Sequence, residues 1–283
     1  MRTGDSVVVG IDGSDAAIAT SQWAVREAVV RDVPLKLIFA VNTIRTQGHR
    51  ELTGPEVGYG EQSLRAATAA IEAMDQPVKV ETDIVWGPPS NALVGYSRTA
   101  ALVCVGTVGI GAVSRAVLGS TATGVAGRAH CSVAVIRPHD DGTVANFVAV
   151  GIDDSPEVDA VAEPAFAEAH ARRAPLVAAA VGCNAFGVNS VGRTELRLQE
   201  WRKHYPDVTI DVFEAESTLA DFLTVHQHEL RQRYVSSGSV DVDPSARPLA
   251  VLGSAEVHEV ARIVGPHDHP IVRHPYCSVL VVR

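Results

Sequence analysis

The sequence predicts an α/β protein made of two doubly wound domains, each built on a parallel five-stranded sheet with strand order 3-2-1-4-5. Three observations predict this fold class. Short runs rich in valine and isoleucine alternate with helical patterns. These runs are apolar nearly throughout, which is typical of parallel strands covered on both faces. Finally, the chain repeats its own sequence once along its length.

The repeat is visible in three segments that recur in the same order. Asp12 in "VVVGIDGSDAA" and Asp153 in "VAVGIDDSPEV" occupy equivalent places, 141 positions apart. The other two segments are "RDVPLKLIFAV", which returns as "RRAPLVAAAV", and "HCSVAVIRP", which returns as "YCSVLVVR". The polar stretch "PHDDGTVAN" between the copies suits a linker. We therefore expect a duplicated domain, with copies at 1–140 and 144–283.

In the first copy the strands and the first helix can be placed in order. Ser14 is expected to cap a helix with Arg31 in its last turn, before Pro34. The expected strands lie near residues 6–12, 35–42, 78–86, 101–106 and 132–137.

In the second copy, Ser155 and Pro156 form a favoured start for the equivalent helix. Pro164 stands where the first copy has Trp23, and it predicts a kink or interruption of that helix.

Four glycines, Gly106, Gly109, Gly111 and Gly119, separate the fourth strand from the next helix. In an open α/β sheet, ligands bind where the strand order reverses, which here lies between strands one and four. Asp12 ends strand one and could accept hydrogen bonds from a ribose hydroxyl or an adenine amine. The glycine loop and the following helix start offer N–H groups to an anion. Singly, each feature is also explained as a turn, a helix cap or a carboxylate bonded to loop amides; together they predict a nucleotide site.

The spacing Gly106-x2-Gly109-x9-Gly119-Ser120, after an Asp that ends strand one, resembles the nucleotide motif of the universal stress protein family. The resemblance covers the whole chain as two Rossmann-like copies in tandem. The resemblance implies non-covalent binding of ATP, with or without Mg²⁺. Asp12 would hold the adenosine end, and the Val41 backbone would contact the adenine. The resemblance also implies phosphate contacts and close approach at Gly10, Gly106, Gly109, Gly111, Gly119, Ser120 and Thr121.

The glycine loop departs from the family pattern in one respect. Many relatives have a basic residue among the glycines, whereas this chain has Thr107, Val108 and Ile110. Arg115 is the nearest cation, and it could neutralise a phosphate or lie solvated on the surface. The polar segment 43–60 is expected to be a long loop, either a flap over the nucleotide or simply a mobile connection.

The second copy is expected not to bind nucleotide. Gly253 remains after its fourth strand, but Glu256 stands in place of the second motif glycine and Pro266 replaces Ser120. A carboxylate beside phosphates is repulsive, and proline removes an N–H from the helix start. We therefore expect one nucleotide per chain.

The expected function is a regulatory nucleotide-binding module of the stress response that is not an enzyme; the alternative is a slow ATP-hydrolysing or adenylyl-handling enzyme. The glycine loop offers neither a general base nor a metal-holding carboxylate. The sequence contains no GxGxxG after strand one, no P-loop lysine motif and no nucleophile elbow with a partnered histidine. His267, His269 and His274 could hold a metal, but solvated loop histidines are the expectation.

Composition limits the partners and the compartment. The net charge is −9 and no Lys/Arg cluster is present, which argues against nucleic acid. No membrane span or leader is evident, so a cytoplasmic protein is expected. The four cysteines are expected to be reduced and buried. The apolar final strands of the two copies predict pairing of the domains within the chain and a possible homodimer.

Overall fold

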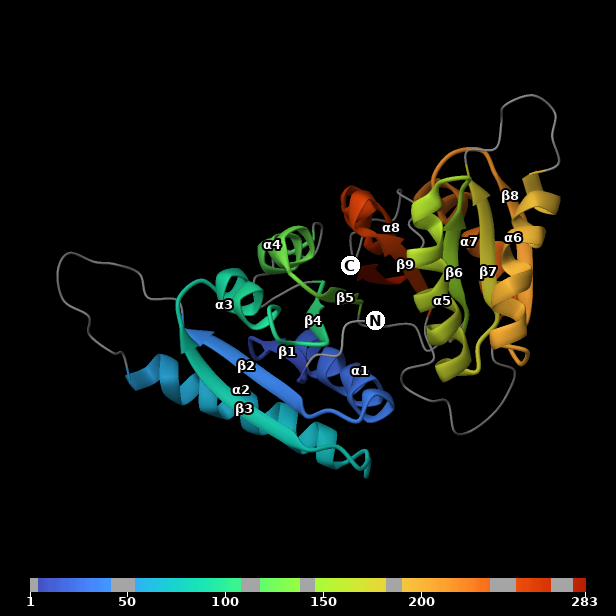
Figure 1. The fold of residues 1–283 in the computed structure, drawn as a ribbon. Helices are drawn as coiled ribbons and strands as arrows, with labels where there is room; N and C mark the ends of the chain where they lie inside the picture. The colour runs from blue at the N-terminus through green and yellow to red at the C-terminus, as the bar shows by residue number, and fades with distance from the viewer. Residues whose placement is uncertain are drawn as a thin grey trace. The chain divides into compact units, whose positions relative to one another are not determined.

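The computed structural model describes residues 5–41, 54–107, 118–137, 146–181, 190–234, 248–265 and 277–283. The chain divides into two compact units, Met1–Pro138 and His139–Arg283, each of which is described by itself. Both are three-layered, with helices on the two faces of a parallel sheet (Figure 1).

The sheet of the first unit has the order β3-β2-β1-β4-β5, which confirms the predicted order 3-2-1-4-5. All of its described pairings are parallel. Each strand begins and ends within two residues of the range expected from the apolar runs. The strands are β1 (Val7–Ile11), β2 (Leu35–Val41), β3 (Val80–Trp86), β4 (Leu102–Gly106) and β5 (Ser132–Ile136).

The described helices of the first unit cover both faces of this sheet (Figure 1). α1 (Asp15–Arg31) and α2 (Gly54–Glu72) pack against each other on one face, while α3 (Pro89–Tyr96) and α4 (Ser120–Arg128) pack together on the other. The predicted cap is confirmed, because the Ser14 hydroxyl accepts the Ala17 N–H at 3.2 Å.

The expectation of a loop over 43–60 is wrong for its last part. Residues 54–60 form the first turns of α2, and Pro55 stands at the helix start, where a missing N–H costs nothing. Residues 42–53 lie outside the described part of the chain, so the flap remains a prediction.

The second unit repeats this architecture, with parallel strands in the order β8-β7-β6-β9-β10. Its strands are β6 (Val148–Ile152), β7 (Leu176–Val181), β8 (Ile210–Ala215), β9 (Leu249–Gly253) and β10 (Ser278–Val282). Its α-helices are α5 (Asp159–Arg172), α6 (Ser190–His204), α7 (Leu219–Arg233) and α8 (Val260–Val264). The described residues of this unit also include the 3₁₀ segments η2 (Pro156–Val158) and η3 (Ser254–Glu259).

Pro164 lies inside α5, and the helix continues through it, so the expected interruption is not found. Pro164 is the sixth residue of α5, and the hydrogen bond that it cannot donate is the one to the Ala160 carbonyl, near the helix start. The chain just before α5 is a 3₁₀ segment. Ser155 and Pro156 start that segment, but the Ser155 hydroxyl donates to Asp153 and does not cap the helix.

The central strands are buried on both faces, as their uninterrupted apolar sequences predict. All residues of β7 except its last are buried, and the first three residues of β1 are fully enclosed. Cys104, Cys131 and Cys277 are buried thiols, as expected, and Cys183 lies outside the described residues. None of the described helices combines the length and the apolar character needed to cross a membrane.

Candidate functional site at the carboxyl ends of β1 and β4

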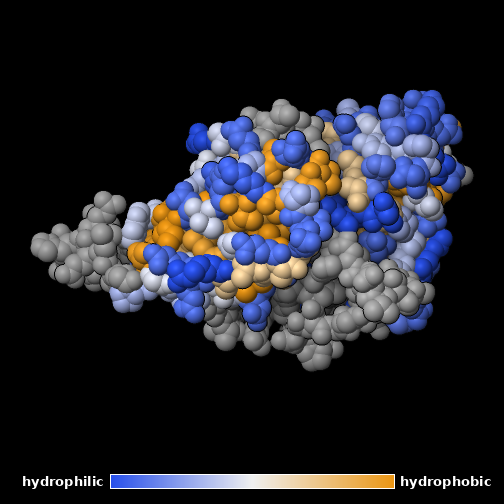
Figure 2. All heavy atoms as spheres, turned by 90° about the horizontal axis from the view of Figure 1, so that it is seen from below, coloured by the Kyte–Doolittle hydropathy of each residue, from blue (hydrophilic) through white to orange (hydrophobic). Residues whose placement is uncertain are grey.

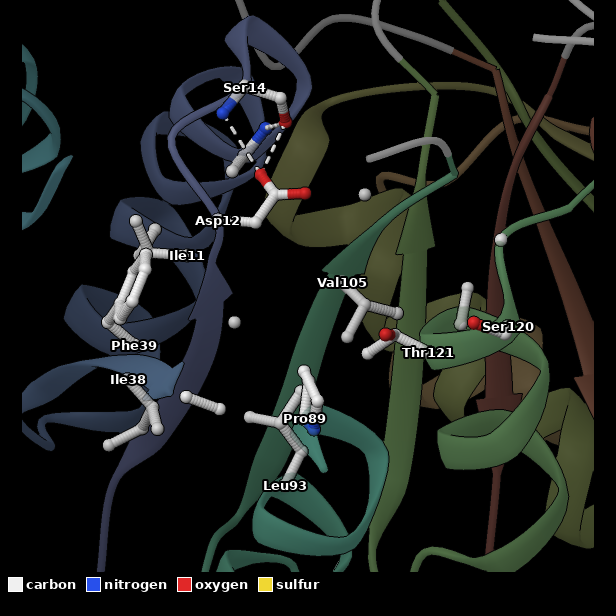
Figure 3. Close-up of a pocket in the computed structure, with 16 residues that line it drawn as sticks. Ile11, Asp12, Ser14, Ile38, Phe39, Pro89, Leu93, Val105, Ser120 and Thr121 are labelled. Atoms are coloured by element: carbon white, nitrogen blue, oxygen red, sulfur yellow. Dashed lines mark hydrogen bonds between the residues drawn. The ribbon is translucent and has the colours of Figure 1, made fainter. Parts of the chain in front are cut away.

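A cavity of about 390 Å³ opens in the first unit where β1 and β4 end side by side (Figure 3). This is the point where the strand order reverses, the usual ligand position in open α/β sheets. The cavity brings together six of the residues predicted to bind nucleotide: Gly10, Asp12, Gly106, Gly119, Ser120 and Thr121. Gly109, Gly111 and Arg115 lie outside the described residues.

Asp12 holds the turn between β1 and α1 and also faces the cavity. Its Oδ1 accepts the Ser14 N–H at 3.0 Å and the Ser14 hydroxyl at 2.6 Å. Its other carboxylate oxygen points away from Ser14, toward the opening between β1 and β4 (Figure 3). The sequence suggested either a carboxylate bonded to loop amides or one that binds a ligand. Each explanation applies to one oxygen of Asp12, because one is bonded to the loop and the other is directed at the cavity.

Tyr59 is a contributor that the sequence reasoning missed. It projects from α2 and donates from its hydroxyl to the Asp12 carbonyl at 3.3 Å. Between them lies Gly13, whose φ of +87° belongs to the region that favours glycine, and a Cβ built there would lie 2.2 Å from the Tyr59 Oη. No local pattern could have indicated this contact, because Tyr59 belongs to a separate helix and remains 42% exposed.

One wall of the cavity is apolar. Ile38 and Phe39 of β2 lie on one side, and Pro89 and Leu93 of α3 approach from below (Figure 3). Phe39 is held edge-on by Tyr59, with ring centroids 6.0 Å apart. Such a wall suits the faces of a planar base.

Gly10 and Val41 take positions that differ from the simplest expectation. A Cβ at Gly10 would lie 2.8 Å from Leu93 Cδ1, so this glycine gives room to α3 on the cavity wall. Val41 is only 2% exposed, and its carbonyl accepts the Gly87 N–H at 2.9 Å. The β2 residues that line the cavity are instead Ile38, Phe39 and Ala40.

The opposite side of the cavity is the start of α4. Gly119 is its N-cap, and the Gly119 N–H donates to the Thr107 carbonyl at 2.9 Å, so the two ends of the glycine loop meet there. Helical bonding begins with the Thr123 N–H on the Gly119 carbonyl, at 3.0 Å. The N–H groups of the first turn, including those of Ser120 and Thr121, therefore have no carbonyl partner within the helix, and a helix N-terminus of this kind attracts anions.

Gly106 serves packing as well as the cavity. A Cβ there would lie 3.3 Å from the Cβ of Ala16, because α1 crosses close to the end of β4. The glycine at this position is therefore explained in part by contact between helix and sheet.

The second unit keeps the Asp turn and changes what faces it. Asp153 Oδ1 accepts the Ser155 N–H at 3.0 Å and the Ser155 hydroxyl at 2.6 Å, as Asp12 does with Ser14. Where the first unit has Tyr59 over this turn, Arg197 donates to the Ser155 carbonyl at 2.8 Å. The hydrogen bonds from the serine to the aspartate are thus the same in both units, although Gly13 has a positive φ and its counterpart Asp154 does not. These bonds cannot by themselves distinguish the functions of the two units.

The chain after β9 departs from the first unit. The 3₁₀ segment η3 begins at once after Gly253, and Glu256 Oε2 accepts the Gly253 N–H at 2.9 Å. Burial raises the pKa of Glu256, and the nearby carboxylates of Glu259 and Asp153 raise it further, while the bond from Gly253 lowers it. A backbone N–H at the end of strand four is thus occupied by the protein's own carboxylate. Pro266 lies outside the described residues.

In the part of the chain that the structure describes, potential metal ligands do not cluster. Within those ranges, no three His, Cys, Asp or Glu side chains are placed to hold a metal ion together. His267, His269 and His274 fall between the described segments, so the expectation that they are solvated stays untested.

Comparison with known proteins agrees with the duplicated fold. The model of the universal stress protein family matches residues 4–137. Universal stress protein Rv2624c of Mycobacterium tuberculosis is 39% identical over 280 residues, covering 98% of this chain and 96% of that protein. Rv3134c of the same species is 39% identical over 299 residues, covering 100% and 97%.

A crystal structure shows the same fold over the full length. A universal stress protein from Archaeoglobus fulgidus aligns with a TM-score of 0.69 at 15% identity, covering 100% of this chain and 97% of that one. The sequence matches extend over nearly the entire chain, so they include both units. The chain belongs to the universal stress protein family.

Proposed function

We propose that the first unit binds one adenine nucleotide, ATP, and that the protein acts as a nucleotide-dependent regulatory module in a stress response. The observation that carries this proposal is the cavity between β1 and β4, which has a carboxylate oxygen on one side and a helix N-terminus on the other. Its volume of about 390 Å³ falls within the usual range of small-molecule sites.

The proposed pose follows from the chemistry of the walls. The base lies against Ile38, Phe39 and Leu93, where its apolar faces lose contact with water. The ribose hydroxyls donate to the cavity-facing oxygen of Asp12. The phosphates extend toward Ser120 and Thr121, whose N–H groups and hydroxyls can donate to them.

The second unit is proposed to bind no nucleotide. There Glu256 already occupies the Gly253 N–H, and its carboxylate lies in the field of Asp153 and Glu259. A polyphosphate would add like charge to that group. The second unit is accordingly a structural or partner-binding copy.

Replacing Asp12 with Asn tests the proposed ribose contact. Asp12→Asn can still present an oxygen to Ser14, but it loses the charge directed at the cavity, and a hydrogen bond to a charged group contributes about 1.5–3 kcal/mol. We expect at least a tenfold loss of ATP affinity by isothermal titration calorimetry. Asp153→Asn is the matched control, since Asp153 makes the same two hydrogen bonds to the serine two residues on, and it should leave ATP affinity unchanged. Equal effects of the two substitutions would refute the assignment.

The alternative, a slow ATP-hydrolysing or adenylyl-handling enzyme, makes a different prediction. Among the described lining residues, Asp12 is the one carboxylate, and it is assigned to the ribose end, remote from the γ-phosphate. We expect phosphate release well below about 1 per second, the low end of typical enzyme turnover. Turnover at or above that rate that disappears in Asp12→Asn would favour the enzyme instead.

A further inference from the structure

A second hollow of the first unit lies away from the nucleotide cavity, between α2 and β3. It is an open groove of about 620 Å³, in which Leu64 and Ala69 of α2 face Val80, Thr82 and Ile84 of β3. Viewed from below, on the side where α2 and β3 lie, the first unit shows apolar residues bordered by hydrophilic ones (Figure 2). The proposed nucleotide binding between β1 and β4 does not use this groove.

Among the described strands, β3 stands at the end of the sheet, so no described strand lies along one side of its backbone. The register of β3 with β2 shows which backbone N–H and C=O groups of β3 point away from the sheet. The Leu35 N–H donates to the Lys79 carbonyl and the Gly87 N–H donates to the Val41 carbonyl, both at 2.9 Å. Residues at odd positions of β3 therefore bond to β2, and the N–H and C=O groups of Val80, Thr82 and Ile84 point outward.

The same three residues carry both features that a strand-binding site needs. Their backbone groups offer a donor and an acceptor at every second position, and their side chains line the groove beside them. Main-chain bonds supply affinity in strand addition, and pockets for alternate side chains supply specificity. Thr82 is exposed, so the middle of this edge is accessible.

The charges around the groove indicate the occupant. Glu61 is paired with Arg65 at 3.6 Å, whereas Glu72, at the end of α2 beside Val80, is exposed. Asp83 also borders the groove, but its carboxylate accepts a hydrogen bond from the Tyr96 hydroxyl of α3, on the other face of the sheet. The negative charge offered to a ligand here is therefore that of Glu72. A basic residue at the end of an apolar extended segment would complement this distribution.

A second copy of β3 is a poorer occupant. Antiparallel pairing centred on Thr82 would place Glu81 opposite Asp83 twice. Pairing centred on either acidic residue would place that residue opposite itself. Pairing centred on Val80 would set Lys79 opposite Glu81, but it would place Pro77 and Gln76, which precede the strand, opposite Asp83 and Ile84. Like charges directly opposite each other destabilise a pair of strands.

We infer that β3 is a docking edge for an extended segment of a partner protein, one that alternates apolar side chains and carries a basic residue at its end. The segment adds a strand beside Val80, Thr82 and Ile84, fills the groove with its apolar side chains, and places its basic end near Glu72.

Fluorescence anisotropy with labelled synthetic peptides tests this inference on the full chain. The probe is a valine/threonine peptide with lysine at both ends. One control peptide has glutamate ends, and another is N-methylated at alternate amides so that it cannot donate to the edge. We expect the lysine-ended peptide to bind, and both controls to bind at least tenfold more weakly, a difference of about 1.4 kcal/mol.

Two variants of one residue separate backbone bonding from side-chain contact. Thr82→Pro removes an outward N–H without touching the bonds to β2, a change that sheet edges tolerate, whereas Thr82→Val keeps that N–H. Thr82→Pro should lose at least tenfold in affinity, and Thr82→Val should retain it. If circular dichroism shows that Thr82→Pro does not fold, the comparison of the N-methylated and unmethylated peptides on the unaltered protein tests whether backbone bonding is required.

Three results would overturn the inference. They are no binding of the lysine-ended peptide at millimolar concentration, equal binding of the N-methylated peptide, and self-association of the protein that disappears in Thr82→Pro. The last result would assign the edge to a second copy of the chain.

Discussion

Replacing Ser120 with Glu is expected to weaken ATP binding at least a hundredfold, about 2.7 kcal/mol, while the protein stays folded. Ser120 is the first residue of α4, is exposed, and lines the cavity where the phosphates are proposed to lie. A carboxylate there repels each phosphate charge, at about 4 kcal/mol per pair for a 4 Å separation and an effective dielectric constant of 20. The same carboxylate favours the helix itself, because negative charge at a helix N-terminus is stabilising.

Ser120→Gln is the matched control, since it has nearly the size of Ser120→Glu without the charge. Isothermal titration calorimetry should show a modest loss for Ser120→Gln and a large one for Ser120→Glu, with equal or higher thermal stability for Ser120→Glu. Comparable losses in the two variants would indicate a steric effect and would remove the argument for phosphate at α4.

Replacing Gly13 with Ala is expected to have the largest effect on stability. The residue has a φ of +87°, where a non-glycine residue costs about 1–3 kcal/mol. The new Cβ would also lie 2.2 Å from Tyr59 Oη and 2.7 Å from Ser63 Oγ, so the Tyr59 contact with the Asp12 carbonyl must be displaced. Because that contact braces the Asp12 turn, we expect ATP affinity to fall together with stability.

Gly58→Ala, one residue before Tyr59, is the control for that measurement. A Cβ at Gly58 meets nothing within 4 Å, and alanine inside a helix is favoured over glycine by about 0.5–1 kcal/mol. Urea denaturation should therefore show destabilisation for Gly13→Ala and stabilisation for Gly58→Ala. A Gly13→Ala protein as stable as the unaltered chain would show that the turn is not braced in this way.

The sequence allowed prediction of those features that depend on local pattern. Apolar runs located the strands, and Ser14 located the start of α1, because a strand's burial and a helix's cap are both encoded within a few residues. The repeat located the equivalent aspartate, Asp153, whose two hydrogen bonds to Ser155 match those of Asp12 to Ser14.

What the sequence did not reveal depends on contacts between distant segments. Tyr59 reaches Asp12 from another helix, and Leu93 explains the glycine at position 10 from the opposite face of the sheet. Residues 54–60 were expected to be loop because they contain three glycines, which lower helix propensity. The packing of α2 on the sheet overrides that propensity. The bond from the Gly253 N–H to Glu256 is different, because it is local: it depends on a 3₁₀ segment that starts directly after β9, where the sequence suggested a carboxylate facing phosphate.

The number of nucleotides bound per chain tests most directly the claim that the first unit binds ATP and the second does not. Native mass spectrometry of the purified protein with added ATP measures this number for the unaltered chain and for Ser120→Glu. We predict one nucleotide on the unaltered chain and none on Ser120→Glu at the same ATP concentration. Two nucleotides per chain, or one that persists in Ser120→Glu, would contradict the assignment.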